Sequence, residues 1–180
     1  MKKLEHFTFD IVQCKKELKL FNQLLLTQSL DERKDILPFF KKNKHLAAFI
    51  GSYIADINTF DRLAFEFPIY GDFVSDYVVG DSKSKNYCFI EFEDANKDSI
   101  FKKLKNKNNS EWSSRFEHGF SQIIDWFWKL SDMKKTDDFR NKYGIGHIRY
   151  FGLLIIGRDS YLTSEEVERL KWRLENIVVD

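Results

Sequence analysis

The chain has 180 residues, of which 43% are hydrophobic and 16% aromatic, and its formal net charge is +1. This length suits one domain with a proper core, so we predict a single domain over residues 1–180. The balanced charge excludes a global field for polyanions, and no apolar run approaches the roughly 20 residues of a membrane span. Cys14 and Cys88 are too few for a disulfide framework, and the N-terminus lacks the apolar segment of a signal peptide. We therefore expect a cytoplasmic protein with no membrane partner.

The first third of the chain reads as helical. Apolar residues at helical spacing predict an N-terminal helix over about residues 10–28, ahead of a core domain over about residues 30–180. Ser29 and Glu32 have the spacing of a capping box, which predicts the start of the next helical segment. Residues 45–58 favour one more short helix.

Three strands in succession follow, over residues 62–70, 72–79 and 87–93, and they predict an antiparallel meander. The last two strands flank a polar loop over residues 80–86. Because side chains alternate along a strand, Glu91 and Glu93 share one face. Two neighbouring carboxylates repel each other, so a central strand that carries them usually has a compensating cation, such as a bound metal ion.

A lysine-rich segment connects the meander to the next helix. Residues 96–110 include five lysines between positions 97 and 107. Such a run is either a mobile surface loop or a patch that faces phosphates, and both interpretations remain open.

Residues 111–130 give the strongest helical pattern, with Arg115, His118, Gln122 and Trp126 on one face. Residues 131–146 look like a polar connection broken by glycines, and residues 148–156 look like a buried strand because they are almost continuously apolar.

A second capping box, Thr163 with Glu166, predicts the start of the last helix. The predicted order is therefore helices, three strands, helix, strand, helix.

This order, with an acid on the second strand and Glu-x-acid on the third, resembles the PD-(D/E)XK nuclease superfamily. The closer likeness is to the Shedu family of anti-phage defence nucleases. Five stretches carry the resemblance: Leu-Asp-Glu-Arg-Lys-Asp-Ile-Leu-Pro-Phe-Phe at 30–40, Asp-Tyr-Val-Val-Gly at 76–80, Phe-Ile-Glu-Phe-Glu-Asp at 89–94, Phe-Ser-Gln-Ile-Ile-Asp-Trp at 120–126 and Leu-Leu-Ile-Ile-Gly-Arg-Asp at 153–159. It implies an α/β fold with a restriction-endonuclease-like αβββαβ core, in which helices flank a mixed central sheet.

The resemblance also implies a site. Asp76 and Glu91 would be metal ligands, Glu93 would assist as a catalytic residue or a further ligand, and Gln122 would orient the site. Carboxylate oxygens on adjacent strands suit Mg²⁺ or Mn²⁺. Glu32 matches an extra acid of some superfamily members, although capping already explains it. Local positive charge makes six residues candidate DNA phosphate contacts: Lys97, Lys102, Lys103, Lys105, Lys107 and Arg115.

Glu93 departs from the superfamily pattern, which usually has lysine at this position. A glutamate could act as a general base or as another ligand. A lysine from elsewhere could supply the missing charge, with Lys83, Lys85 and Lys97 as candidates. Equally, catalysis could be lost while binding survives.

The implied function is metal-dependent DNA cleavage in phage defence. The first alternative is an inactive nuclease-fold module that binds nucleic acid or a protein partner, and the second is a structural or oligomerisation domain. Without the resemblance, Glu91 and Glu93 would read as the solvent face of an edge strand, and Gln122 as a polar helix residue. Shedu relatives assemble into oligomers, so the resemblance also implies a homo-oligomer.

Overall fold

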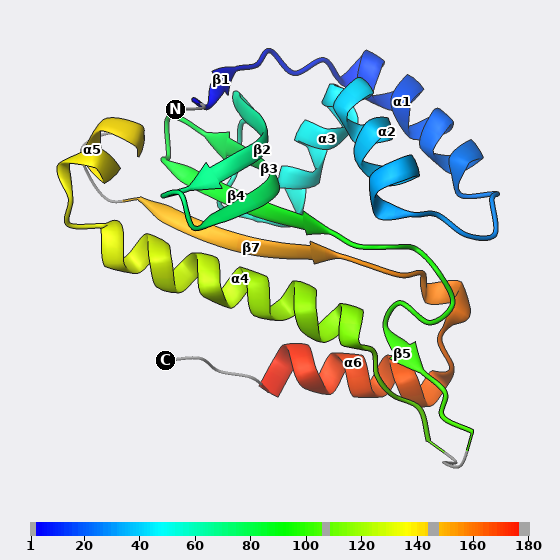
Figure 1. Ribbon diagram of the computed structural model, residues 1–180. Helices are drawn as coiled ribbons and strands as arrows, with labels where there is room; N and C mark the ends of the chain where they lie inside the picture. Colours follow the sequence, from blue (N-terminus) through cyan, green and yellow to red (C-terminus); the bar gives the residue numbers. More distant parts are fainter. Residues whose placement is uncertain (1–2, 106–108, 144–147, 177–180) are drawn as a thin grey trace.

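A computed structural model describes residues 3–105, 109–143 and 148–176, so the predicted breakers Gly144 and Gly146 lie outside the described residues. It has a mixed α/β architecture with a five-stranded sheet in the order β1-β2-β3-β4-β7, flanked by helices (Figure 1). The strands of this sheet are β1 (Glu5–His6), β2 (Arg62–Ile69), β3 (Phe73–Asp81), β4 (Asn86–Phe92) and β7 (Arg149–Ile155). In the described ranges, no helix has the length and apolar character needed to cross a membrane.

The predicted meander is confirmed, since β2, β3 and β4 pair antiparallel in succession. The hairpin loop between β3 and β4 is shorter than predicted, because both strands continue into the polar segment. The Asp81 carboxylate explains this: it accepts hydrogen bonds from the backbone N–H groups of Lys83 and Ser84 at 2.9 and 3.0 Å. The side chain thus closes the turn that the sequence left as a long loop.

Helical segments from the N-terminal third of the chain cover one face of the sheet. They are α1 (Ile11–Leu24), the π-helix η1 (Glu32–Ile36), α2 (Leu37–Lys42), α3 (Lys44–Phe49) and the 3₁₀ turn η2 (Ile50–Tyr53). The N-terminal helix is confirmed but ends before the predicted residue 28. The predicted cap at Ser29 is wrong. Asp31 caps η1 instead, accepting from the N–H groups of Arg33 and Lys34, and Ser29 bonds to Asn96. Asp31 takes this role because it directly precedes the first helical residue.

The opposite face is covered by α4 (Ser114–Met133) and α5 (Asp137–Tyr143), as Figure 1 shows for α4 alongside β7. Helix α4 lies close to the sheet at Gly152 of β7, where an added Cβ would stand 2.3 Å from a methyl carbon of Ile123. The polar connection predicted for residues 131–146 is wrong in part, because it contains α5. Phe139 and Tyr143 of α5 are buried in the core on this face, and their spacing of four residues places them on one side of a helical turn.

The predicted buried strand at 148–156 is confirmed as a strand but not as buried. It is β7, an edge strand parallel to β4, and its residues are half-buried or exposed. Its apolar run reflects contacts on both faces, with the N-terminal helices and with α4, while its outer edge lacks a strand partner among the described residues.

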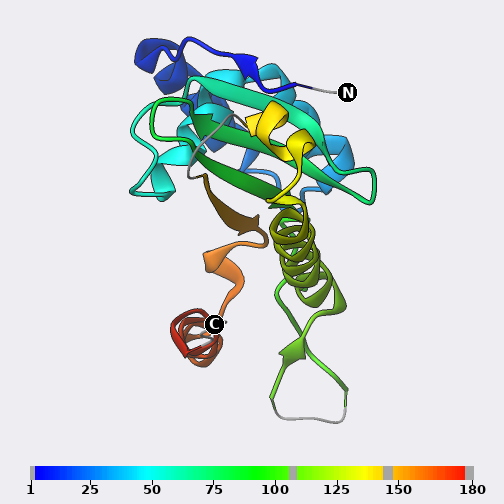
Figure 2. The same cartoon turned by 90° about the vertical axis from the view of Figure 1, so that its left-hand side faces the viewer.

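The remaining elements lie at one end of the molecule, as Figure 2 shows. They are the short pair β5 (Phe101–Lys102) and β6 (Glu111–Trp112), the 3₁₀ turn η3 (Asp159–Tyr161) and α6 (Ser164–Asn176). The predicted capping box is confirmed: Thr163 N–H donates to the Glu166 carboxylate at 2.9 Å, and Glu166 N–H donates to Thr163 Oγ1 at 3.3 Å.

Candidate active site

Asp76 and Glu91 lie side by side at one end of the central strands. The register pairs Tyr77 with Ile90, so Asp76 and Glu91 are the next residues along β3 and β4. The Phe92 N–H donates to Asp76 Oδ2 at 2.7 Å, which fixes the Asp76 carboxylate against β4. Ile90 and Phe92 pack in the core beneath the N-terminal helices, so Glu91 points to the α4 side. The predicted alternation of the third strand is therefore confirmed.

The sheet is distorted next to Asp76. On β2, Glu66 lies between two residues that pair with β3 on either side of Asp76, and its φ is 47°. A non-glycine residue in this left-handed region costs about 1–3 kcal/mol. Glu66 also forms an ion pair with Lys41 at 2.9 Å. Strain of this kind is concentrated at functional sites, which makes this end of the sheet a candidate.

An open pocket of about 350 Å³ lies over Glu91, and we call it the acidic pocket; its lining is Asp31, Glu32, Arg33, Glu91, Glu93, Asp94, Arg115, His118 and Gln122. Glu93 and Asp94 directly follow β4, and Glu32 begins η1. Asp94 Oδ1 accepts from the Glu32 N–H at 2.8 Å, which ties η1 to the end of β4. Glu91, Glu93 and Asp94 are all buried, and Glu32, from a distant part of the chain, lies beside them and is partly buried.

Glu91 and Glu32 in the pocket, and Asp76 beside Glu91 on the neighbouring strand, lack adequate compensation for their negative charge. Burial raises the pKa of Glu91 to about 9, and the charges of Asp76, Glu32 and Glu93 add to this rise. Burial likewise raises the pKa of Glu32 to about 7, helped by Asp76 and Glu93. Burial raises the pKa of Asp76 to about 6, although the bond from Phe92 opposes the rise. A bound cation would reverse this penalty.

Gln122, which was predicted to orient the site, lies on α4 and lines the pocket beside Glu91. Its side chain hydrogen-bonds to the Glu91 carboxylate, which lowers the pKa of Glu91 and partly offsets the effect of burial. Gln122 Oε1 is buried and accepts no hydrogen bond within the described ranges. A buried acceptor left unpaired costs about 1–3 kcal/mol, so this oxygen is suited to bind a water or a ligand.

Arg115, on the first turn of α4, is in the same pocket. Its Nη1 lies 2.8 Å from Glu93 Oε2, and its Nη2 lies 3.1 Å from Asp94 Oδ2. Of the residues that the structure describes, no three His, Cys, Asp or Glu side chains are already arranged to hold a metal ion. Glu93 and Asp94 are engaged by Arg115 instead.

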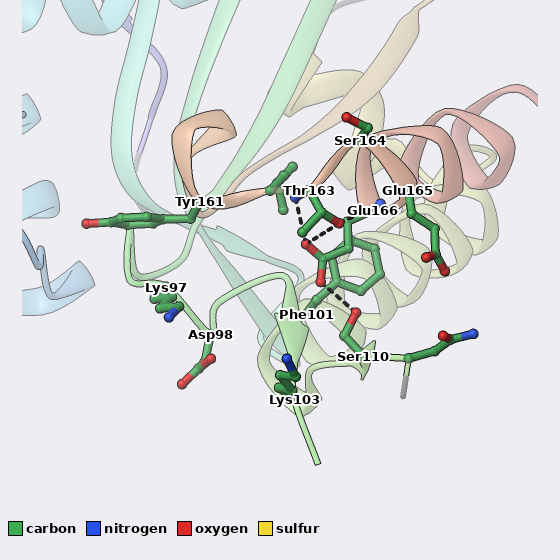
Figure 3. A pocket seen from close by; sticks show the side chains of 12 residues that line it. Lys97, Asp98, Phe101, Lys103, Ser110, Tyr161, Thr163, Ser164, Glu165 and Glu166 are labelled. Carbon is green, nitrogen blue, oxygen red and sulfur yellow. Dashed lines mark hydrogen bonds between the residues drawn. The ribbon is translucent and has the colours of Figure 1, made fainter. Parts of the chain in front are cut away.

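The other predicted phosphate contacts lie elsewhere. Lys97, Lys102, Lys103 and Lys105 are exposed on the segment around β5, and Lys107 lies outside the described residues. Lys97 and Lys103 line a separate pocket of about 540 Å³ with Tyr161 and the start of α6 (Figure 3). Glu165 and Glu166 also line it, so its charge is mixed. Lys83 and Lys85, considered as substitutes for the usual lysine, are at the hairpin turn, which is the far end of β3 and β4.

Among the residues that line the acidic pocket, Asp94 was not predicted, Glu32 was expected only as a possible extra acid, and His118 was placed only on the helix face of Gln122. Glu32 was already explained as a cap. Asp94 could have been found, because it directly follows Glu93 and continues the acidic run. His118 precedes Gln122 by one helical turn, a spacing that places both side chains on one face of α4.

Comparison with known proteins adds the family. No curated protein and no solved structure matches the chain significantly. A family described as "Shedu protein SduA, C-terminal" matches residues 29–180, a range that contains every residue of the acidic pocket. The chain therefore belongs to the Shedu SduA C-terminal family, and this membership suggests a role in Shedu defence.

Proposed function

We propose that this chain is a metal-dependent DNA endonuclease of the Shedu type, which hydrolyses phosphodiester bonds in anti-phage defence. The observation that carries the proposal is that Asp76 and Glu91 are neighbours on β3 and β4, close enough to Glu32 for the charges to interact, with a pKa raised at each. The family match supports it, as does the order of the main elements, in which helices precede β2, β3 and β4 and α4 precedes β7.

The donor set fits Mg²⁺ or Mn²⁺, since both prefer carboxylate oxygens and ordered water. Asp76 and Glu91 would be the central ligands. The unpaired Oε1 of Gln122 would accept a hydrogen bond from a water in the pocket. Because no complete ligand set is formed among the described residues, we expect a rotation of the Glu32 side chain to complete the site.

Each side chain then has a role in phosphodiester hydrolysis. When bound, the ion supplies polarisation of a phosphate oxygen and lowers the pKa of the attacking water. The Phe92 N–H holds Asp76 in place, and Gln122 holds Glu91. His118 lines the pocket opposite the strands, where it could exchange a proton with substrate or water. The exposed lysines around β5 would contact DNA phosphates further from the reaction.

A second candidate has one observation in its favour. Arg115 already neutralises Glu93 and Asp94, which is what a pocket without a metal ion would need. A module of this kind would bind nucleic acid or a partner protein through the same surface and cut nothing. It predicts salt-sensitive DNA binding with no metal-dependent nicking. The homo-oligomer stays a prediction for either function.

A nicking assay separates these functions. The purified chain is incubated with supercoiled plasmid and Mg²⁺ or Mn²⁺, with a chelator as the blank, and Glu91→Ala is compared with Glu168→Ala. Glu168 is an exposed glutamate paired with Lys171 on α6, away from the pocket. We expect nicking by the wild type and Glu168→Ala and none by Glu91→Ala. Equal nicking by both variants, or no nicking by the wild type, would overturn the proposed function.

A further inference from the structure

Arg115 is half in solvent and half in the acidic pocket. Its side chain is 43% exposed, while those of Glu93 and Asp94 are 4% and 11% exposed. Buried carboxylates thus hold part of the guanidinium, while the side chain as a whole stays accessible to solvent. A guanidinium has five N–H donors, and these two ion pairs engage two of its nitrogens. Donors remain for an anion that enters from solvent.

Arg173 shows what an arginine with a purely structural role looks like in the same molecule. Its side chain is 16% exposed, and it binds both carboxylate oxygens of Glu117 at 2.6 and 2.7 Å. Its guanidinium carbon also lies 4.7–4.9 Å from the ring centroids of Trp112, Phe116 and Phe120. Arg173 joins α6 to α4 and is covered by both. Arg115 is held as firmly on one side but remains accessible on the other.

The position of Glu93 is fixed from several directions. Its N–H donates to the carbonyl oxygen of Ile155 on β7 at 2.9 Å, which anchors the backbone to the sheet. Its side chain packs against α4 at Gly119, where an added Cβ would lie 3.3 Å from Glu93 Cγ. Gly119 follows Arg115 by about one helical turn. This close approach brings the carboxylate of Glu93 to the guanidinium of Arg115 and fixes both groups.

The ion pairs also divide the acids of the pocket into two groups. Glu93 and Asp94 are compensated by Arg115, whereas Asp76 and Glu91 form no ion pair among the described residues. Glu32 lies between the groups, with its Oε2 4.0 Å from Arg115 Nη1. The pocket thus offers a fixed positive group beside a set of carboxylates that can receive an ion. A phosphate diester bound there would contact both.

On these grounds we propose that Arg115 is the phosphate-binding residue of this site, and that Glu93 is its positioning residue and not a metal ligand. This assignment rests on the proposed function and makes it more specific. A fixed guanidinium at the reacting phosphate stabilises the negative charge that develops there, without reorganisation during the reaction. It also gives Glu93 a task that a glutamate can perform, since the positive charge then comes from α4.

The test combines cleavage with DNA binding for Arg115→Ala, Glu93→Gln and the double variant, with Arg140→Ala as the control. Arg140 is an exposed arginine paired with Asp137 on α5. Binding of a labelled DNA duplex is measured with Ca²⁺ at several salt concentrations. We expect Arg115→Ala to bind more weakly and to lower the salt slope by about one phosphate contact. We expect its cleavage rate to fall about 100-fold, while Arg140→Ala matches the wild type.

The double variant decides what Glu93 does. If Glu93 acts through Arg115, Glu93→Gln lowers the cleavage rate of the wild type but lowers that of Arg115→Ala no further. The Mn²⁺ concentration for half-maximal rate is then unchanged. Arg115→Lys should recover part of the rate, because lysine keeps the charge but not the two-pronged geometry. Additive losses together with a raised Mn²⁺ requirement would overturn the proposal by making Glu93 a ligand. Wild-type DNA binding by Arg115→Ala would also overturn it. A wild type that binds DNA but never cuts defeats the proposed function alone, and the binding measurements still decide the role of Arg115.

Discussion

Glu91→Gln should stabilise the metal-free protein at neutral and alkaline pH. Burial and the neighbouring acids raise the pKa of Glu91 from 4.5 to about 9, so the folded protein keeps a proton that the unfolded chain releases. The stability due to this group is fully present below the unfolded pKa and is lost as pH rises towards the folded pKa. Between 4.5 and about pH 7.5 the loss is at most about 4 kcal/mol, at 1.36 kcal/mol per pH unit. Glutamine is neutral at every pH, so Glu91→Gln does not lose this stability as the pH rises.

Thermal unfolding in a chelator, followed by circular dichroism from about pH 4.5 to 8.5, measures this effect. We expect Glu91→Gln and wild type to melt together at the acid end, and the variant to melt several degrees higher at about pH 7.5, given roughly 2–4 °C per kcal/mol for a chain of this size. Glu168→Gln, on the exposed face of α6, should follow the wild type. Adding Mg²⁺ should raise the melting temperature of the wild type but not of Glu91→Gln. A variant that is less stable at every pH would refute this reasoning.

Gln122→Leu should keep the fold, because leucine has a similar volume and removes an unpaired buried oxygen, yet plasmid nicking should fall at least about 10-fold. An unchanged nicking rate would show that Gln122 does not orient the site. Gly152→Ala should lower the melting temperature by several degrees, because the new Cβ would lie 2.3 Å from Ile123 and overpacking costs about 1–3 kcal/mol. An unchanged melting temperature in calorimetry would contradict the close approach of α4 to β7. The exposed lysines around β5 are Lys97, Lys102, Lys103 and Lys105. Replacing them with glutamine should weaken DNA binding and reduce the salt dependence of binding, while Mn²⁺ binding stays intact. An unchanged salt dependence in a fluorescence titration would show that DNA binds elsewhere.

Local patterns predicted the elements that local interactions determine. The meander and the face shared by Glu91 and Glu93 follow from strand alternation, and the structure has both. The capping box at Thr163 also formed as predicted, because both of its hydrogen bonds join residues three apart. At the start of η1, two cap residues competed within three positions. The sequence pattern favoured Ser29, whereas Asn96, far along the chain, binds Ser29 and leaves the cap to Asp31.

Burial and charge pairing depend on tertiary contacts, and here the sequence was less informative. The apolar run of β7 looked fully buried, but strand order places it at the edge of the sheet. Arg115 looked like an open phosphate contact, and its ion pairs with Glu93 and Asp94 depend on how closely α4 approaches β4. That Asp76 and Glu91 are neighbours could be predicted from the two strands alone. That Glu32 lies beside them depends on how the whole N-terminal segment packs on the sheet, which the sequence did not predict.

We propose that Asp76, with the carboxylates of the acidic pocket, binds the divalent ion that cleavage needs. Calorimetric titration of Mn²⁺ into the metal-free chain at neutral pH tests this most directly, with Asp76→Asn as the comparison. Asp76 is held by the Phe92 N–H, a bond that asparagine can keep through its carbonyl oxygen, so the variant changes the charge with little change in shape. We expect saturable Mn²⁺ binding by the wild type and its loss in Asp76→Asn. Equal binding by both proteins would contradict it.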